Sequence, residues 1–326
     1  MPPLLSCMYS VFQRKIGLPC IISYMTTNSD SSGIAWSEIN AALHNLVKAD
    51  GGFSSAHRGI VTLPGGQQLF VKVGVDDSTR KWARKEVVAY RFLKRHNYPF
   101  IPALLSTNED ETSFALEPLN LSDGWDWSET WTKARLDKTL EAMDALAAII
   151  PSDEDKTLFE EKTIDETDDG WQQFVEDADR QTILLSKLRA AGHAEIVDAL
   201  DFTAMAERSA RYVFTNDALV HNDVRADNCP WDEHTGTIKL VDWNWLQLGD
   251  RRIDLAAMLT HIQNAGLNLL PDYASRLDSD ALHWMAGFWF NSATKPIWPG
   301  GPEHLRERQL EAGVTALKLA RERGNK

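Results

Sequence analysis

Apolar residues follow two different spacings along the chain, which divide it into a strand-rich first part and a helical second part. Residues 69–73 form a short apolar run interrupted only by Lys72, as in a buried strand. Residues 78–96 repeat apolar side chains at helical spacing, with basic side chains on the opposite face. Helical spacing dominates from Trp131 onward, in the series Leu136, Leu140, Met143, Leu146 and Ile150. The pattern predicts an α+β fold with most of its strands before its longer helices.

A polar loop interrupts the helical part and is flanked by two further predicted strands. Leu219 and Val220 lead into the loop, and the apolar run 238–241 follows it, with Asp242 directly at the end of that run. The loop itself, residues 221–228, reads His-Asn-Asp-Val-Arg-Ala-Asp-Asn. Such a spacing of aspartate and asparagine usually forms only a turn, because both side chains bond to nearby backbone. The flanking strands and the second carboxylate instead indicate a catalytic loop for phosphoryl transfer.

The residue types of this loop suit phosphoryl transfer to a hydroxyl group. Such a reaction requires the acceptor to be positioned and the phosphate charge to be neutralised. Asp223 is predicted to accept the hydroxyl proton, and Arg225 is the second catalytic candidate. Asn228 and Asp242 offer an amide oxygen and a carboxylate, which suit Mg²⁺ because this ion prefers oxygen ligands. We expect His221 to lie below the loop and to hold its backbone through a ring hydrogen bond.

In this region the chain resembles the aminoglycoside phosphotransferase and choline kinase family of small-molecule kinases. The family's loop typically reads H-G-D-x-x-x-x-N, and Asn222 replaces its glycine here. The family's metal-binding strand end reads D-[WF]-[DE], and Asn244 replaces its acid. Residues 249–256 are similar to the family's G-D-x-x-x-D-L-A segment, which implies that Asp254 is a structural residue that anchors the catalytic loop from a helix start.

The resemblance implies a protein-kinase-like fold of two lobes. A small strand-rich N-lobe at residues 34–116 would bind nucleotide, and a larger helical C-lobe at residues 117–326 would carry the catalytic loop and the acceptor site. Lys72 would reach the α- and β-phosphates and pair with Glu86 in the following helix. The alternatives are a lysine on an edge strand and a glutamate on a solvated helix face.

Two further N-lobe features are candidates for nucleotide contacts. The glycine-rich segment 51–59 resembles the family's phosphate-covering loop, in which Ser54 and Ser55 would contact the phosphates. A glycine-rich turn before a hairpin explains the segment equally well. Glu117 and Leu119 lie in the connector where the family has its adenine hinge, so their backbone groups would meet the base. The donor would be ATP or GTP, and the sequence does not choose between them.

Composition places the chain among ordinary globular proteins. It has 326 residues, of which 43% are hydrophobic and 25% charged, enough for two lobes around a shared cleft. The three cysteines have no paired spacing, so a reducing cytoplasm is the simplest location. Residues 1–33 contain apolar stretches interrupted by Gln13-Arg14-Lys15, which makes a poor signal peptide and too short a membrane span. We expect a flexible or artefactual N-terminal arm and no membrane partner.

Negative charge is concentrated in one segment of the C-lobe. Residues 151–180 contain twelve acids and three bases, a net charge of −9 out of −13 for the whole chain. Such a balance makes nucleic acid an unlikely partner. The segment is either a solvated surface or a rim that attracts a cationic small-molecule acceptor, such as an amino sugar or a choline-like amine.

Three functions are compatible with these residues. The first is a kinase of a small, cationic metabolite or antibiotic. The second is a protein kinase, but only twelve positions from Asp242 to Asp254 leave no room for an activation segment. The third is a non-catalytic pseudokinase, which Asn244 and the irregular glycine-rich segment favour, whereas the intact Lys72 and Asp223 favour an enzyme.

Overall fold

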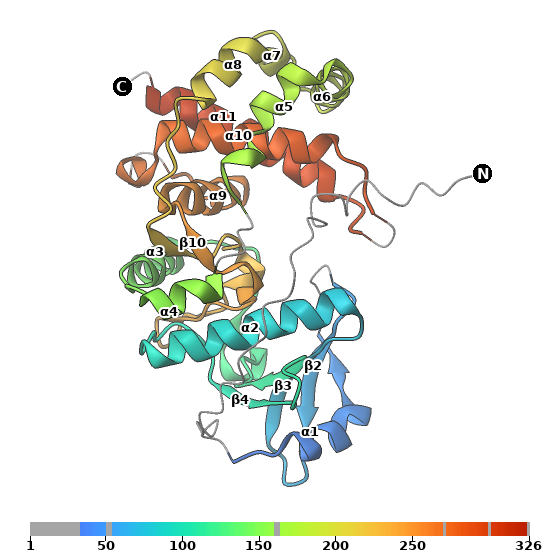
Figure 1. Cartoon of the computed structure of the whole chain (residues 1–326). Helices are drawn as coiled ribbons and strands as arrows, with labels where there is room; N and C mark the ends of the chain where they lie inside the picture. The colour runs from blue at the N-terminus through green and yellow to red at the C-terminus, as the bar shows by residue number, and fades with distance from the viewer. Residues whose placement is uncertain (1–32, 50–53, 160–163, 270–271, 299–300, 325–326) are drawn as a thin grey trace, which may run out of the picture.

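An antiparallel sheet of five short strands forms the N-lobe of the computed structural model, which describes residues 33–49, 54–159, 164–269, 272–298 and 301–324. The predicted N-terminal arm, except residue 33, and residues 51–53 of the glycine-rich segment lie outside these ranges. The strands are arranged in the order β1-β2-β3-β5-β4 (Figure 1). Their bounds are Val47–Lys48, His57–Thr62, Gln68–Val73, Leu104–Thr107 and Ser113–Leu116 for β1 to β5.

Strand β3 lies inside this sheet and carries Lys72. It pairs with β2 on one side and β5 on the other, so that Lys72 lies opposite Arg58 and Phe114. The predicted strand 69–73 is therefore confirmed, and the edge-strand interpretation of Lys72 is wrong. The turn between β2 and β3 contains Gly65 and Gly66, both with positive φ, which a residue with a β-carbon rarely adopts.

Helix α2, Asp77–Arg95, lies between the sheet and the helical lobe (Figure 1). Asp76 begins it with a capping box, because its carboxylate accepts the Thr79 N–H at 2.8 Å while the Thr79 hydroxyl accepts the Asp76 N–H at 3.1 Å. The helix confirms the prediction for residues 78–96. Glu86 is 1% exposed, so the alternative of a solvated helix face is also wrong.

The C-lobe is mostly helical, and α10 packs along α11 while also contacting α5, α6, α8 and α9. The apolar series predicted after Trp131 does form a helix, but this helix ends at Ala147, and Ile150 is 87% exposed. Within the described ranges, no helix is both long and apolar enough to cross a membrane. The helices are α3 Lys133–Ala147, α4 Asp153–Lys156, α5 Gly170–Glu176, α6 Ala178–Ala190, α7 Ala194–Val197, α8 Phe202–Ser209, α9 Arg251–Asn264, α10 Ser279–Thr294 and α11 Leu305–Gly324.

Short strand pairs flank the predicted catalytic loop, residues 221–228, inside this lobe. Strand β7, Ala218–Val220, pairs with β10, Gln247–Gly249. Strand β8, Trp231–Asp232, pairs with β6, Trp125–Asp126, and with β9, Thr237–Ile238. These pairs hold both ends of the segment that contains the predicted catalytic and metal-binding residues.

The prediction of a strand over residues 238–241 is wrong beyond Ile238. The backbone N–H groups of the next three residues bond alternately to two segments: Lys239 to Pro230, Leu240 to Phe100, and Val241 to Asn228, in the same segment as Pro230. The segment is extended and fully buries Leu240, but it has no single partner strand. Asp242 therefore follows an irregular extended segment.

Candidate active site

The predicted catalytic loop, residues 221–228, begins directly after β7 and is anchored by a carboxylate from helix α9. Asp254, which is 3% exposed, accepts the backbone N–H of His221 at 3.1 Å and that of Asn222 at 2.9 Å. Asn222 has φ of 63°, and its side-chain amide donates to the Trp245 carbonyl at 3.1 Å. The two bonds from Asp254 hold the chain where it bends into the loop. The structure thus brings Asp254 to the position that the sequence resemblance implied.

His221 connects the catalytic loop to the segment that precedes Asp242. Its Nε2 lies 3.0 Å from the Val241 carbonyl oxygen, and its Nδ1 lies 3.3 Å from the Asp223 backbone nitrogen. Because a carbonyl only accepts, Nε2 carries the proton and Nδ1 accepts the N–H of Asp223. Burial lowers the pKa of His221 to about 4, so the ring is neutral at physiological pH. Its contacts are those of a residue that holds backbone.

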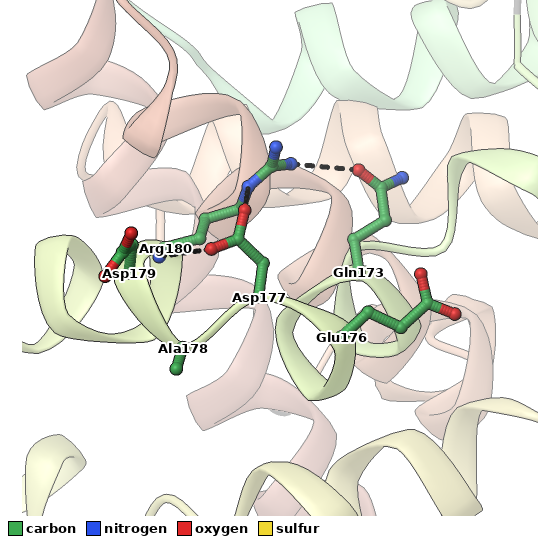
Figure 2. A pocket seen from close by; sticks show the side chains of 6 residues that line it. All are labelled: Gln173, Glu176, Asp177, Ala178, Asp179 and Arg180. Carbon is green, nitrogen blue, oxygen red and sulfur yellow. Dashed lines mark hydrogen bonds and ion pairs between the residues drawn. The ribbon is translucent and has the colours of Figure 1, made fainter.

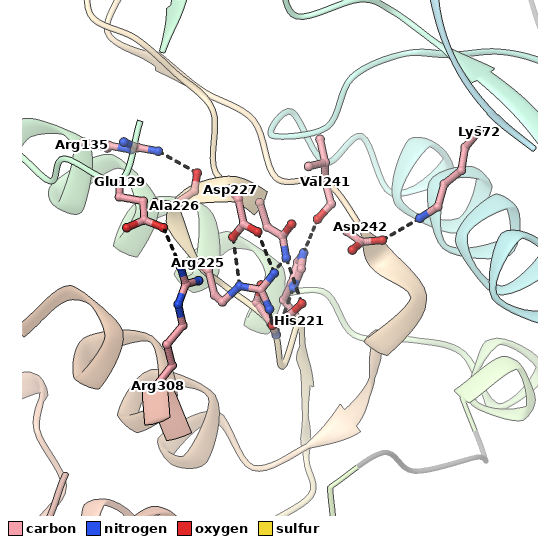
Figure 3. A network of polar contacts seen from close by, with 12 residues as sticks. Lys72, Glu129, Arg135, His221, Arg225, Ala226, Asp227, Val241, Asp242 and Arg308 are labelled. Carbon is pink, nitrogen blue, oxygen red and sulfur yellow. Dashed lines mark hydrogen bonds and ion pairs between the residues drawn. The ribbon is translucent and has the colours of Figure 1, made fainter. Parts of the chain in front are cut away.

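Asp223, the predicted base, is paired with Arg225. Arg225 Nη1 lies 2.6 Å from Asp223 Oδ1, while Nε and Nη2 each donate to Asp227 at 2.9 Å (Figure 3). Burial raises the pKa of Asp223 to about 7, although the charge of Arg225 opposes this rise. A carboxyl that titrates near neutrality is suited to accept a proton at physiological pH.

The predicted metal ligands, Asn228 and Asp242, lie on adjoining segments joined by a backbone bond from Val241 N–H to the Asn228 carbonyl at 3.0 Å. Asn228 donates through Nδ2 to the Asp223 carbonyl at 2.8 Å and to Asp223 Oδ2 at 3.0 Å, which leaves its amide oxygen for another ligand. In the described ranges, no three acidic, histidine or cysteine side chains form a metal cage. Two oxygen donors fit Mg²⁺, which is commonly shared between one or two protein groups and substrate phosphates.

Lys72 brings the two lobes together at this point. Its Nζ lies 2.5 Å from Glu86 Oε1. The same Nζ lies 2.8 Å from Asp242 Oδ1 (Figure 3). Burial alone would lower the pKa of Lys72, but the two carboxylates raise it above its ordinary value. Burial raises the pKa of Glu86 to about 7 against the opposing charge of Lys72. The predicted Lys72 and Glu86 side chains therefore meet, and Asp242 joins them across the lobes.

The remaining nucleotide candidates lie further from this cluster. The Ser55 hydroxyl donates to the carboxylate of Asp76 at the start of α2. In the connector, the Glu117 carboxylate accepts the Ala103 N–H at 3.2 Å, and the Leu119 carbonyl accepts the indole N–H of Trp127 at 2.8 Å. Within the described residues, the Glu117 carbonyl and the Leu119 N–H have no protein hydrogen-bond partner. These two groups are available to a ligand, whereas Ser54 makes no polar contact in the described part of the chain.

Comparison with solved structures identifies the architecture. The structure is similar to the choline kinase LicA from Streptococcus pneumoniae, with a TM-score of 0.50 and 13% sequence identity over 88% of this chain and 98% of that one. The chain has a choline-kinase-like fold. This confirms the predicted α+β, protein-kinase-like architecture and the resemblance stated from the motifs.

Two other solved structures show lower similarity. They are a choline/ethanolamine kinase family protein from Mesorhizobium loti (TM-score 0.48, 12% identity, 85% of this chain and 92% of that one) and a Plasmodium vivax ethanolamine kinase (TM-score 0.49, 10% identity, 87% and 85%). The amino-acid sequence itself matches no protein-family model and no curated protein.

Sequence reasoning missed one buried residue of the site, Arg135 in α3. Its guanidinium donates to the carbonyl oxygen of Ala226 at 2.9 Å (Figure 3). It also donates to the carbonyl oxygen of Cys229 at 2.8 Å, on the other side of Asn228. No motif marks this arginine, since it contacts only backbone atoms of the loop. The helical spacing was the available signal, because Arg135 lies on the same face as the buried Thr139 and Ala142.

The acids of residues 151–180 make several different local contacts in the structure. Asp155 pairs with Arg95 at 2.6 Å, while Asp165, Asp169 and Asp177 accept backbone N–H groups at the starts of helical turns. A hollow of about 530 Å³ lies where α5 meets α6, and Figure 2 shows that Arg180 in it contacts Asp177 and Gln173. Helix capping by Asp165, Asp169 and Asp177 therefore accounts for part of the charge that the sequence left as a surface or a rim. The acids classed as exposed are Asp153, Glu154, Glu166, Glu176 and Asp179.

Proposed function

We propose that this protein is a kinase that transfers the γ-phosphoryl group of ATP or GTP to a hydroxyl group of a small molecule. One observation carries the proposal: Lys72 Nζ lies within 2.8 Å of both Glu86 and Asp242, which come from distant segments of the two lobes. A buried lysine held by two carboxylates is a ready site for phosphate oxygens, because the cation is already positioned before a ligand arrives. Asp223 and Asn228 are coupled to one another beside this cluster.

The residues of the catalytic loop have separate roles in this proposal. Asp223 orients the acceptor hydroxyl and takes its proton, which its pKa of about 7 permits near neutral pH. Arg225, whose Nη1 contacts Asp223, places a positive charge next to the group being transferred. His221 and Asp254 hold the backbone of the loop and take no part in proton transfer.

The nucleotide would lie between the connector and Lys72. The Glu117 carbonyl and the Leu119 N–H would bond to the base, and Lys72, oriented by Glu86, would bond to the α- and β-phosphates. Ser54 and Ser55 stay predicted phosphate contacts. Asn228 and Asp242 would supply oxygen ligands to Mg²⁺, which neutralises phosphate charge when it is bound.

A cationic acceptor is the finer part of the proposal. The structural neighbour from Streptococcus pneumoniae is named a choline kinase, and choline is a cation. In this chain the support comes from the exposed carboxylates that cap no helix, among them Glu166, Glu176 and Asp179. Their attraction for a cation is long-range and screened by salt.

Acceptor-dependent release of ADP or GDP tests the proposal. Choline, ethanolamine, amino sugars, aminoglycosides and macrolides would each be added to the wild-type protein with Mg²⁺ and either nucleotide. We expect turnover with at least one acceptor, and a decrease in turnover of about 10²- to 10⁴-fold in Asp223→Asn. Full turnover in the Asp223→Asn protein would exclude this residue as the base.

One observation favours a non-catalytic nucleotide-binding protein as the second candidate. Asn244 stands where the family has an acid, and its buried Oδ1 has no hydrogen-bond partner in the described part of the chain. Calorimetry with magnesium nucleotide separates the two candidates. Tight nucleotide binding by the wild type without turnover on any acceptor would support the non-catalytic function.

A further inference from the structure

Arg135 is a buried cation that has no carboxylate within ion-pair distance in the described ranges. It lies in the first turn of α3, is 1% exposed and packs its guanidinium over the Trp131 ring at 4.7 Å. Burial lowers the pKa of Arg135 from its ordinary value. A buried guanidinium is costly unless its N–H groups find acceptors. Nη1 and Nη2 of Arg135 make four bonds to carbonyls, whereas its Nε has no partner among the described residues.

These four carbonyls belong to two segments of the active site. Nη2 bonds to Ala226 and Cys229, the residues on either side of Asp227 and Asn228. Nη1 bonds at 2.8 Å to two carbonyls, those of Ser128 and Thr130, in the segment that follows the connector. One side chain thus joins the turn that carries Asn228 to the chain that leaves the nucleotide connector.

The turn held by Arg135 determines where two predicted functional groups lie. Asn228 donates to the Asp223 carboxylate at 3.0 Å and would present its amide oxygen to Mg²⁺. If the turn moves, both the metal ligand and the partner of Asp223 move with it. Carbonyl acceptors add a directional constraint, because a planar guanidinium bonds two of them only when they lie in its plane.

We propose that Arg135 is a positioning residue, which fixes the turn 226–229 and thereby the Asn228 amide and the Asp223 carboxylate. For any effect on turnover, this inference rests on the proposed kinase function. The effect of Arg135 on the position of the turn 226–229 does not depend on that function. The competing explanation is that Arg135 only stabilises the C-lobe.

The variant Arg135→Met removes the guanidinium and retains a long apolar side chain. We expect the Mg²⁺ concentration that half-saturates nucleotide binding in calorimetry to rise about 10-fold, as for other residues that orient a metal ligand. Nucleotide affinity in the absence of Mg²⁺ should stay at the wild-type value. A residue that only stabilises the lobe would lower the melting temperature and leave the Mg²⁺ requirement unchanged.

Arg306 offers a matched control. It is also buried, at 6% exposed, lies over the Trp298 ring at 5.8 Å and donates to the Pro296 carbonyl at 2.7 Å, but it belongs to α11. Arg306→Met should lower the melting temperature and retain the wild-type Mg²⁺ requirement. An equal rise in both variants would overturn the proposal, because the effect would then follow from a general loss of stability.

Chemical rescue tests the same role in a different way. Arg135→Ala leaves a space for free guanidinium, which at millimolar concentration should lower the Mg²⁺ requirement back toward that of the wild type. The same addition should have no such effect on Arg306→Ala. If guanidinium left the Mg²⁺ requirement of Arg135→Ala unchanged while restoring its melting temperature, the positioning role would be wrong.

Hydrogen exchange tests the turn without any nucleotide or acceptor. The N–H of Asn228 bonds to the Arg225 carbonyl at 3.0 Å and that of Cys229 to the Ala226 carbonyl at 3.3 Å. Both amides should exchange faster in Arg135→Met and at the wild-type rate in Arg306→Met. Unchanged exchange in Arg135→Met would overturn the proposal even if the kinase function were correct. Faster exchange in a protein that binds no nucleotide would support the turn's dependence on Arg135 while the kinase function failed.

A milder variant, Arg135→Lys, keeps the proposal testable if Arg135→Met fails to fold. Arg135→Lys retains the charge and most of the stem, but a single ammonium cannot reach all four carbonyls. We expect a smaller rise in the Mg²⁺ requirement and a smaller increase in exchange than in Arg135→Met. If neither quantity differed from the wild type in Arg135→Lys while Arg135→Met failed to fold, Arg135 would be a stabilising residue only.

Discussion

The substitution Asp223→Asn should stabilise the folded protein above neutral pH while lowering its turnover about 10²- to 10⁴-fold. The carboxyl has a pKa of about 7 in the folded chain, compared with an ordinary value of 3.8. The folded state therefore favours the protonated form. Stability from this preference is fully present below pH 3.8 and is lost as the pH rises through 7. Asparagine resembles the protonated acid at every pH, so it avoids that loss.

The structure sets the size of the effect. A rise of about three pKa units corresponds to a ceiling of about 4 kcal/mol at pH 8, since one unit is about 1.4 kcal/mol. The Asp223 side chain is 20% exposed and bonds to Arg225 and Asn228, and the substitution weakens these bonds. We therefore expect a net gain of about 1–2 kcal/mol in the free energy of unfolding, or roughly 2–6 °C in melting temperature.

Thermal unfolding of the nucleotide-free protein between pH 5 and pH 8 measures this gain. The difference in melting temperature between Asp223→Asn and the wild type should be small at pH 5 and largest at pH 8. Glu86 and Asp254, whose pKa values are also raised, to about 7 and about 6, are present in both proteins and cancel in the difference. Asp227→Asn is the control, because Asp227 is the other carboxylate bound to Arg225 and its own side chain is 48% exposed. This variant should give no comparable gain in melting temperature. A difference that stayed constant with pH would refute the reasoning.

Three further predictions concern the metal, the loop anchor and the acceptor. Asp242→Ala should abolish Mg²⁺-dependent nucleotide binding in calorimetry and Asn228→Ala should raise the Mg²⁺ requirement, whereas binding as tight as in the wild type would place the metal elsewhere. Asp254→Asn should lower the free energy of unfolding by about 2–3 kcal/mol in urea titrations, because an amide nitrogen then faces one of two backbone donors; a loss below 0.5 kcal/mol would contradict the anchoring role. The acceptor KM should rise with ionic strength, and neutralising Glu166, Glu176 and Asp179 together should raise KM and flatten that response; if both quantities stay unchanged in the triple variant, these acids form only a solvated surface.

From the sequence alone, neutralising Asp165, Glu166, Asp168 and Asp169 together is predicted to leave the melting temperature near that of the wild type, as for surface charges. The structure corrects this prediction, so the test of the acidic segment uses exposed acids instead. Asp169 is 8% exposed and caps α5, and Asp165 caps the turn before it. Removing these caps should lower the melting temperature whether or not the acceptor is cationic.

Local signals were sufficient for the elements that carry the N-lobe side of the site. Residues 69–73 and 78–96 could be predicted because strand and helix spacing are visible within a short window. The same spacing could not predict that helix α3 ends at Ala147, because Ile150 is apolar and continues the spacing but is exposed. Nor could it show that residues 239–241 lack a single partner strand, because their N–H groups bond to two segments, residues 228–230 and the distant Phe100.

Some residues of the candidate site could likewise be predicted from the sequence, and others could not. The resemblance brought together Asp223, Asn228 and Asp242 in advance, whereas their roles as base and metal ligands stay predictions. Arg135 could not be assigned, because its four partners are carbonyl groups, which every residue has. Helix caps at Asp165 and Asp169 could have been found, since an acid just before a helix start is a short-range signal.

The ion pair between Lys72 and Asp242 has a consequence for the order in which ligands enter. Lys72 Nζ lies 2.8 Å from the carboxylate that Mg²⁺ would need, so a free metal ion must compete with an ammonium that is already in place. Nucleotide phosphates would offer Lys72 another partner in place of Asp242, and this would leave the carboxylate for the metal. Magnesium alone should therefore leave the melting temperature almost unchanged, and nucleotide and metal should raise it only in combination. The pair would make the proposed metal site conditional on the nucleotide, so that Asp242 would be closed to abundant divalent ions when no nucleotide is bound.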